Sequence, residues 1–315
     1  MILQTRKNVL LFGGSGTAGR AAGMALLRAG HSVTCFGRSD PQIKDATIIL
    51  GDVMSLPRDV FADQKYDVVV SCLASRTGTP EDAWNVDHQA QLAILTAAKE
   101  AGASQFVLLS ATCVQKPKLA FQQAKLAFEA ELVGSGLNYS IVRPTAFFKS
   151  LSGQIDRVKR GKPFLVFGDG TLTACKPISD RDLGDFIASC LIDPEKMNEI
   201  LPIGGPGPAL TARQQGELLF DVLGQEPKFK HVPVALMSLI ITGLSVLGVV
   251  NKAAKAKSEL ARIGHYYATE SMLVWNGTEY DADATPSFGQ DTLRDHYVGV
   301  VSGEILVNRA EHAVF

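Results

Sequence analysis

The chain has 315 residues, with 31 Lys and Arg against 32 Asp and Glu, 46% hydrophobic residues, 29 glycines and 14 prolines. This composition excludes a disordered chain, and the length permits either two domains or one large domain with a sizeable core. A formal net charge of −1 provides no general attraction to phosphate backbones, so nucleic acid is not an expected partner.

Short apolar, β-branched runs alternate with helical stretches through the first half of the chain. The predicted strands are 8–12, 31–36, 47–50, 67–71, 105–110 and 138–142, and helices include 20–29, 85–101 and 121–134. Strict alternation implies right-handed crossovers and a parallel sheet covered on both faces, which is the doubly wound, Rossmann-like α/β fold. We expect a nucleotide-binding domain over residues 1–150 and a smaller substrate-binding region over 151–315, interleaved with the first domain.

A glycine-rich turn joins the first predicted strand to the first predicted helix. Gly14, Gly16 and Gly19 have the dinucleotide-binding spacing, and Gly13 adds a second three-residue spacing. Glycines allow a tight turn and a close approach to pyrophosphate, while the helix amino terminus offers N–H groups to the anion. Such turns also have purely structural uses, but the position between a strand and a helix favours a nucleotide site. The residues expected to line it are Gly13, Gly14, Ser15, Gly16, Thr17 and Gly19.

The end of the second predicted strand discriminates between the two nicotinamide cofactors. An acidic residue there would hold the ribose 2′-hydroxyl of NADH, whereas this chain has Arg38. A guanidinium suits the 2′-phosphate of NADPH, so NADPH is the predicted cofactor, with Arg20 as a second contact. After the next strand, Asp52 and Val53 are expected at the adenine. The alternatives are a solvated surface arginine and an exposed loop acid.

With these sequence motifs, the chain resembles the extended or atypical branch of the short-chain dehydrogenase/reductase superfamily. Further motifs are Ser110-Ala111, residues 142–145 and residues 178–183. The active-site motif of that superfamily is Tyr-x-x-x-Lys, and here it reads Phe121-Gln-Gln-Ala-Lys125. The resemblance implies that Lys125 holds the nicotinamide ribose. It also assigns to the cofactor site the residues Leu73, Ala74, Ser75, Ser110, Pro144 and Thr145.

The phenylalanine in this motif changes the expected chemistry. Phe121 has no proton to give, so an alkoxide forming from a ketone would lack its usual acid. Two explanations stay open at this point. Either the protein binds nucleotide without catalysis, or it delivers hydride to a substrate that needs no tyrosine donor.

Five sequence segments resemble a more specific family within this superfamily, and the resemblance extends over about residues 8 to 300. The segments are 70–78, 109–117, 143–150, 167–178 and 263–272. They are similar to the NADPH-dependent 3,8-divinyl (proto)chlorophyllide a 8-vinyl-reductases of chlorophyll and bacteriochlorophyll synthesis. The resemblance implies that NADPH reduces an 8-vinyl group to ethyl on a magnesium tetrapyrrole, whose macrocycle spreads the negative charge. A catalytically silent NADP-binding sensor or assembly protein, and a reductase of another conjugated alkene, remain alternatives.

The same segments contain candidate side chains for the substrate. Tyr266 and Tyr267 are the first candidates for a catalytic proton donor, although such residues are more often packed or hydrogen-bonded side chains than catalysts. Phe147 and Phe148 follow a strand end and have flat rings that suit a flat macrocycle, with core packing as the alternative. The residues expected at the substrate are Phe147, Phe148, Cys113, Cys175 and His265.

The cysteines and the amino terminus indicate the compartment. The five cysteines lack the paired spacing of a zinc or redox site, so we expect buried thiols in a reducing compartment and no metal site. The amino terminus runs directly into a predicted strand and is too short for a leader or transit peptide. We therefore expect a bacterial, cytoplasmic protein.

An uncharged apolar stretch covers residues 232–250 and is followed by Lys252, Lys255 and Lys257. Its 19 residues reach the lower bound for a bilayer span, about 17–25 residues. Pro233 and two glycines weaken that interpretation, so a buried or interfacial helix pair is expected instead. Residues 232–257 are predicted to make peripheral contact with an anionic membrane surface. The sequence leaves the oligomeric state open.

Overall fold

The computed structural model describes residues 6–55, 59–62, 64–248 and 251–306. The prediction about a leader peptide concerns the amino terminus, of which residues 1–5 lie outside the described residues. The chain divides into two compact units. Unit 1 comprises Met1–Ser75, Pro80–Pro144 and Asp180–Ile203, and unit 2 comprises Arg76–Thr79, Thr145–Ser179 and Gly204–Phe315.

Unit 1 is built on a seven-stranded parallel sheet with strand order β3-β2-β1-β4-β5-β6-β9. Its strands are β1 (Asn8–Phe12), β2 (Ser32–Gly37), β3 (Thr47–Leu50), β4 (Val68–Ser71), β5 (Gln105–Leu109), β6 (Asn138–Pro144) and β9 (Glu199–Ile203). The central strands β4 and β5 are buried throughout, as expected of a parallel sheet covered on both faces. The predicted doubly wound α/β fold is confirmed.

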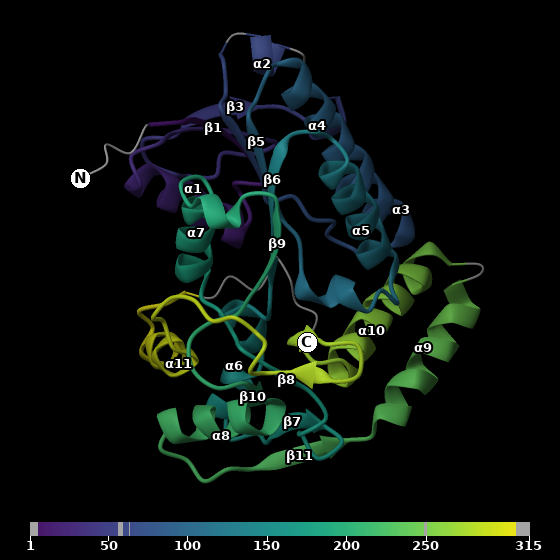
Figure 1. The fold of residues 1–315 in the computed structure, drawn as a ribbon. Helices are drawn as coiled ribbons and strands as arrows, with labels where there is room; N and C mark the ends of the chain where they lie inside the picture. The colour runs from purple at the N-terminus through teal and green to yellow at the C-terminus, as the bar shows by residue number, and fades with distance from the viewer. Residues whose placement is uncertain (1–5, 56–58, 63, 249–250, 307–315) are drawn as a thin grey trace. The chain divides into compact units, whose positions relative to one another are not determined.

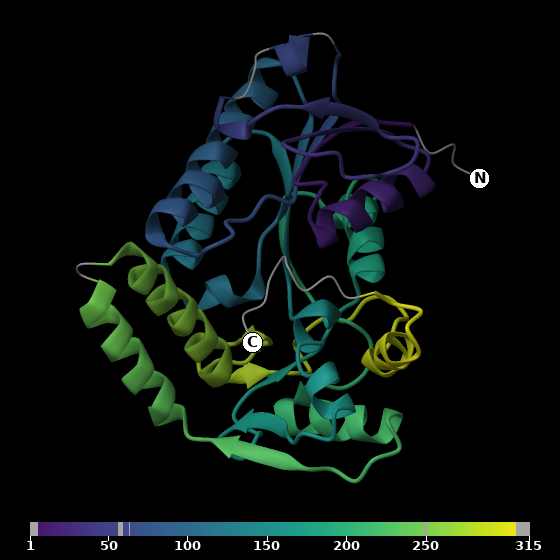
Figure 2. The ribbon, with the colours of Figure 1, turned by 180° about the vertical axis from the view of Figure 1, so that it is seen from behind.

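Helices cover both faces of this sheet (Figure 1; Figure 2 shows it from behind). On one face, α1 (Thr17–Arg28) packs against α7 (Asp180–Ser189), so closely that a Cβ on Gly184 would lie 2.5 Å from the Ala21 carbonyl oxygen. The opposite face carries α3 (Pro80–Ala83), a π-helical turn (Trp84–Ala90), α4 (Gln91–Glu100) and α5 (Ala120–Val133). Shorter elements are α2 (Asp59–Ala62) and 3-10 turns at Val53–Ser55, Thr112–Gln115 and Pro194–Lys196.

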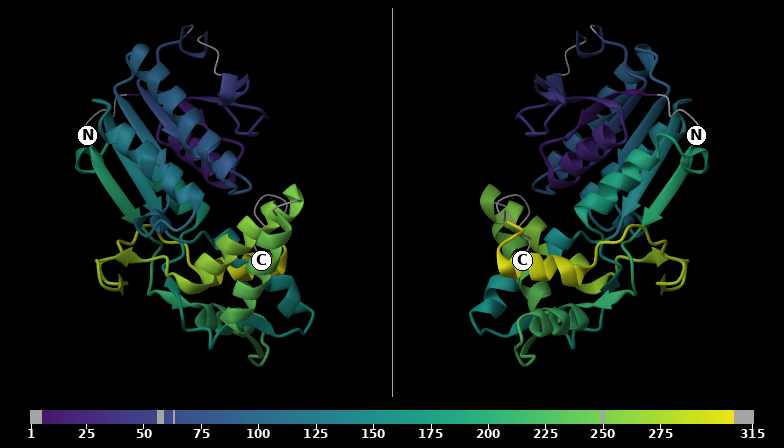
Figure 3. Two further views of the ribbon diagram at one scale, coloured as in Figure 1. Left: turned by 90° about the vertical axis from the view of Figure 1, so that its right-hand side faces the viewer. Right: turned by 90° about the vertical axis from the view of Figure 1, so that its left-hand side faces the viewer.

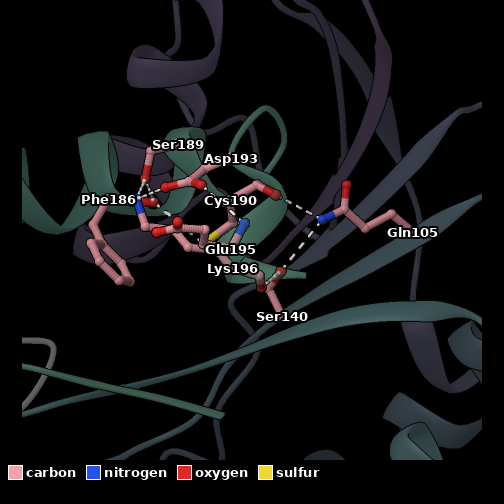
Figure 4. Close-up of polar contacts among 8 residues, drawn as sticks. All are labelled: Gln105, Ser140, Phe186, Ser189, Cys190, Asp193, Glu195 and Lys196. Atoms are coloured by element: carbon pink, nitrogen blue, oxygen red, sulfur yellow. Dashed lines mark hydrogen bonds and ion pairs between the residues drawn. The ribbon is translucent and has the colours of Figure 1, made fainter. Parts of the chain in front are cut away.

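Hydrogen bonds tie the segment 180–203 to the sheet of unit 1 (Figure 4). Gln105 Nε2 donates to the Cys190 carbonyl at 2.8 Å and to Ser140 Oγ at 3.4 Å. Ser140 Oγ donates to the Lys196 carbonyl at 2.7 Å, and Lys196 Nζ donates to Ser189 Oγ at 2.7 Å. These bonds join α7 and the turn after it to β5 and β6. Residues 180–203, which lie beyond position 150, are therefore part of unit 1 and contribute a strand to its parallel sheet.

Strand β9 is the element of this sheet that the sequence did not predict. It pairs with β6 in parallel and contains Pro202 opposite Arg143. Proline cannot donate to a ladder, which argues against a central strand but is tolerated at an edge. β9 is an edge strand, so its proline costs the sheet little.

Unit 2 contains three two-stranded sheets and several helices (Figure 3). The strand pairs are β7 (Phe164–Phe167) with β11 (Phe229–Val232), β8 (Ala174–Cys175) with β10 (Leu210–Thr211), and β12 (Val274–Trp275) with β13 (Tyr280–Asp281). The helices are α6 (Ile155–Lys159), α8 (Ala212–Val222), α9 (Val234–Gly248), α10 (Lys252–Thr269) and α11 (Leu293–Ser302), with a 3-10 turn at Phe148–Leu151. Aromatic and aliphatic residues from the 3-10 turn Phe148–Leu151, α6, β7, α8 and α11 form a hydrophobic core cluster in this unit.

The apolar stretch forms α9, which lies beside α10 (Figures 1 and 3), with Ser245 Oγ and Ser258 Oγ 2.8 Å apart. The expected helix pair is confirmed, but α9 is not a buried helix, because none of its side chains is buried. Leu239 is 70% exposed and Val246 is 68% exposed. Positions 249 and 250 of the predicted stretch lie outside the described residues. Within the described part of the chain, we find no helix with the length and apolar character needed to cross a membrane.

Candidate active site

The glycine turn lies against the end of β4. Gly13 has a φ of +78°, and a Cβ there would lie 2.6 Å from both the carbonyl carbon and the carbonyl oxygen of Cys72. A Cβ on Gly19 would lie 2.1 Å from the Gly13 oxygen, so side chains fit at neither position. The strand order reverses between β1 and β4. Open α/β sheets bind their ligands outside the carboxyl ends of strands at such a switch point.

The amino end of α1 fits an anionic group. Gly16 is the N-cap residue, no side chain caps the helix, and its first turn contains no acidic residue. The positive end of the helix dipole is therefore not matched by a carboxylate of its own first turn, as a pyrophosphate site requires. Ser15 and Thr17 are partly buried in the same turn. The residues present fit a dinucleotide.

The residues predicted to contact the adenine end of the cofactor lie on α1, after β2 and after β3. Arg38 and Arg20 are exposed, and within the described ranges neither side chain forms an ion pair. Asp52 is exposed as well, and its Oδ1 accepts a hydrogen bond from the Met54 backbone N–H at 3.0 Å. This bond orders the turn that contains Val53. Their contacts with a cofactor stay predictions.

Lys125 forms a buried ion pair on the opposite face of the sheet from α1. Its Nζ lies 2.9 Å from Asp87 Oδ1, and Lys125 and Asp87 are 8% and 1% exposed. Asp87 belongs to the π-helical turn, and the same oxygen accepts a hydrogen bond from the Ser75 backbone N–H at 3.3 Å. Phe121 lies one turn earlier on α5 and is partly buried. The Phe-x-x-x-Lys motif therefore contains a fixed cation and lacks the phenol of the superfamily motif.

Cys72 links this ion pair to the glycine turn. Desolvation raises the pKa of the Cys72 thiol to about 12, and the positive charge of Lys125 acts in the opposite direction. The Asp87 carboxylate bonds both to Lys125 and to the Ser75 backbone N–H, three residues after Cys72, so the ion pair lies near the carboxyl end of β4. The adjacent Leu73 packs on the core of unit 1, and Ala74 is exposed. Lys125, Asp87 and the glycine turn thus meet at one edge of the sheet.

A second buried carboxylate lies one turn further along α5. Glu129 is 3% exposed; its Oε1 accepts hydrogen bonds from Ser110 Oγ at 2.5 Å and Arg143 Nε at 3.3 Å, and its Oε2 pairs with Arg143. The hydroxyl proton of Ser110 is therefore engaged by protein. Pro144 is buried at the end of β6. Thr145, which begins the next segment of unit 2, donates its hydroxyl proton to the Lys176 carbonyl.

The predicted proton donors lie on α10 of unit 2. Tyr266 is buried, and its ring meets the Tyr267 ring edge-on with centroids 5.6 Å apart. Tyr267 and His265 are partly buried. Their catalytic role stays a prediction.

The predicted substrate residues differ in burial. Phe147 is partly buried, whereas Phe148 belongs to the core of unit 2, with its ring centroid 5.4 Å from that of His296. Cys113 is buried in unit 1, and Cys175 is buried in unit 2, where desolvation raises the pKa of its thiol to about 12. Core packing accounts for Phe148 and both thiols without a ligand. The assignment of these residues to a substrate stays a prediction.

Comparison with known proteins identifies the family. An NAD(P)H-binding family matches residues 13–194. The divinyl chlorophyllide a 8-vinyl-reductase of Cucumis sativus, a chloroplastic protein, is 48% identical over 94% of this chain and 76% of its own length. The chain belongs to the divinyl chlorophyllide a 8-vinyl-reductase family. The predicted resemblance and the nicotinamide dinucleotide cofactor are thereby confirmed.

This 8-vinyl-reductase family member also has a more distant likeness in sequence and one in structure. The photosystem II assembly factor Ycf39 of Trieres chinensis is 26% identical over 74% of each chain. The structure of an NADPH-dependent quinone oxidoreductase from Escherichia coli complexed with NADPH superposes with a TM-score of 0.67 at 14% identity, covering 93% of this chain and 99% of that one. At such low identity, the superposition demonstrates the fold alone.

Sequence reasoning missed Asp87, although the pattern contained a signal. Asp87, Gln91, Ile94 and Leu95 have helical spacing and are all buried, so an acid stands on the apolar stripe of its helix. An acid at a core position needs a partner, and Lys125 is that partner. In the described part of the chain, no cluster of three or more His, Cys, Asp or Glu side chains is arranged to hold a metal ion.

Proposed function

We propose that this chain is an oxidoreductase that uses NADPH to reduce the 8-vinyl group of divinyl chlorophyllide a, or of divinyl protochlorophyllide a, to ethyl. The reaction would serve chlorophyll or bacteriochlorophyll synthesis. The observation that carries the proposal is a motif with a fixed cation, Lys125, and a phenylalanine where the superfamily has its acid. Membership in the 8-vinyl-reductase family supports the substrate.

The missing tyrosine fits a vinyl substrate. The bound cofactor supplies a hydride, and the conjugated macrocycle spreads the resulting negative charge over many atoms. No alkoxide forms, so Phe121 need not be an acid. The chain's own task is to bind and orient: the glycine turn and α1 bind the pyrophosphate, and Lys125 holds the nicotinamide ribose. Tyr267 or Tyr266 donates the proton to carbon, with His265 or solvent as alternatives.

NADPH is favoured over NADH by the charges after β2. Arg38 and Arg20 are exposed guanidinium groups near the ends of elements that flank the glycine turn. A 2′-phosphate carries two negative charges that such groups bind, and no carboxylate occupies the Arg38 position to repel it. In this proposal unit 1 binds the cofactor.

Incubation of the purified protein with NADPH and divinyl chlorophyllide a tests the function. We expect a blue shift of the Soret band as one conjugated vinyl group is lost, together with NADPH oxidation in equal amount. NADPH binding without any spectral shift would instead favour a silent NADP-binding sensor or assembly protein, the class suggested by the likeness to Ycf39. Turnover with another conjugated alkene, but not with the pigment, would indicate a different reductase.

A further part of the proposal is peripheral contact between residues 232–257 and an anionic membrane, with the protein acting at the cytoplasmic surface. Helix α9 exposes Leu239, Val246 and neighbouring apolar side chains. Lysines stand on either side of it, and no acidic residue occurs from 227 to 258. An apolar face bordered by cations suits the boundary between acyl chains and anionic headgroups.

Flotation with vesicles tests this contact. We expect the protein to float with phosphatidylglycerol vesicles, less with phosphatidylcholine vesicles, and Val246→Asp to reduce flotation severalfold. Met24→Asp, at an exposed position of unit 1, is the matched control. Equal flotation of Val246→Asp and the unchanged chain would refute the contact.

A further inference from the structure

Among the residues that the structure describes, Asp87 has one carboxylate oxygen without a hydrogen-bond partner. Its Oδ1 receives both the Lys125 ammonium and the Ser75 N–H. Its Oδ2 is buried, and no donor in the described part of the chain forms a hydrogen bond with it. Buried polar atoms in native proteins are nearly always satisfied, so an orphaned carboxylate oxygen calls for a donor from outside the protein.

The backbone around Asp87 is also unusual. Residues Trp84–Ala90 form a π-helical turn between α3 and α4. π-Helical turns are rare, usually cost stability, and occur often at functional sites. This turn carries Asp87 to Lys125 and to Ser75, which follows β4 by a few residues. The orphaned oxygen therefore belongs to the same edge of the sheet as the glycine turn.

The chemistry of the pair indicates which group of the cofactor would reach it. A carboxylate repels phosphates, so Oδ2 needs an uncharged donor. A ribose hydroxyl both accepts and donates a hydrogen bond, and it therefore matches an ammonium and a carboxylate oxygen that share one ion pair. Of the groups in NADPH, the nicotinamide-side ribose has two free hydroxyls, and it is the ribose assigned to Lys125.

We propose that Asp87 is a cofactor-binding and positioning residue, whose Oδ1 holds the Lys125 ammonium and whose Oδ2 accepts a hydrogen bond from the nicotinamide-side ribose of NADPH. This inference rests on the proposed use of NADPH. It extends the site from the Phe-x-x-x-Lys motif of α5 to the π-helical turn Trp84–Ala90.

Asp87→Asn is the sharpest variant, because an amide keeps one acceptor for Lys125 and replaces the other oxygen by a donor. Three ligands separate the parts of NADPH: NADPH itself, 2′-phospho-ADP-ribose, which lacks the nicotinamide, and 2′,5′-ADP, which lacks the second ribose. We expect Kd to rise about tenfold or more for the first two ligands and less than twofold for 2′,5′-ADP. Fluorescence titration or calorimetry measures all three constants.

Asp67→Asn is the matched control. Asp67 also belongs to unit 1, but it accepts a hydrogen bond from the Asn8 backbone N–H at 2.8 Å, at the opposite edge of the same sheet. We expect this variant to leave the ratio of the three Kd values unchanged. In the double variant Asp87→Asn/Lys125→Met, which removes both charges of the pair, the selective loss should persist and should not exceed the larger of the single effects.

Several results would overturn the proposal. Equal weakening of NADPH and 2′,5′-ADP in Asp87→Asn would indicate a structural role alone. Unchanged NADPH binding would remove Asp87 from the cofactor site, and a double variant with wild-type ratios would do the same if Asp87→Asn fails to fold. Weakened NADPH with unchanged 2′-phospho-ADP-ribose would assign Oδ2 to the nicotinamide instead. None of these binding constants depends on pigment turnover, so failure of the proposed reaction is separately visible.

Discussion

Helix α5 holds two buried ion pairs on successive turns, and they differ in one respect. Glu129 uses both carboxylate oxygens, which accept from Ser110 and Arg143. Asp87 accepts from Lys125 and Ser75 through one oxygen and leaves the other without a donor in the described structure. The Glu129 pair needs no ligand, because donors within the protein satisfy both of its carboxylate oxygens. A buried pair with an unsatisfied oxygen is costly unless a ligand completes it, so the comparison distinguishes a structural pair from the pair that we propose binds the cofactor.

Lys125→Met should have the largest effect on this comparison. It removes the cation that orients the ribose and leaves Asp87 buried without a counter-charge. We expect kcat for vinyl reduction to fall on the order of 100-fold, because misalignment of the nicotinamide reduces the benefit of proximity. Steady-state rates from the Soret shift measure it, with circular dichroism to verify the fold. An unchanged rate would remove Lys125 from the site.

Arg38→Asp tests the end of the cofactor that carries the 2′-phosphate. A carboxylate against the 2′-phosphate replaces an attraction by a repulsion, so Kd for NADPH should rise roughly 10- to 100-fold. NADH, which lacks this phosphate, should bind with little change. Equal losses for both cofactors would contradict the assignment of Arg38.

Glu129→Gln should affect stability rather than cofactor selectivity. Removal of the negative charge leaves the partly buried Arg143 without its counter-ion, which costs about 3 kcal/mol of unfolding free energy for a buried pair. Urea denaturation measures this loss. The ratio of Kd values for NADPH and 2′,5′-ADP should stay within twofold of wild type, in contrast to Asp87→Asn. A selective loss of NADPH in Glu129→Gln would remove the distinction between the two pairs.

Phe121→Tyr should have the smallest effect. It restores a phenol one turn before Lys125, but an acid at that position has no alkoxide to protonate in vinyl reduction. We expect kcat to change less than twofold. An increase of tenfold or more would mean that proton donation by α5 limits the reaction, and it would argue against the role of the macrocycle as the electron acceptor.

Local patterns predicted much of unit 1. The apolar runs ending at Phe12 and Leu50 became β1 and β3 with the expected bounds, and the helix expected at 121–134 is α5. The glycine turn was also predictable, because the spacing of its glycines reflects a tight turn that depends only on the local backbone conformation. Strand β9 was missed since its proline contradicts strand propensity. It forms because β6 offers it an edge, which no local pattern records.

The sequence by itself determined the fold class, the glycine turn, the phenylalanine in the active-site motif and the family, since each depends on residues close together in the chain or on long matching strings. Only the tertiary structure decided which charged groups meet. Asp87 and Lys125 lie on different elements, and both become buried when the π-helical turn packs against α5. The exposure of α9 likewise depends on tertiary structure, because hydrophobic periodicity in the sequence does not show whether other elements pack over an apolar helix.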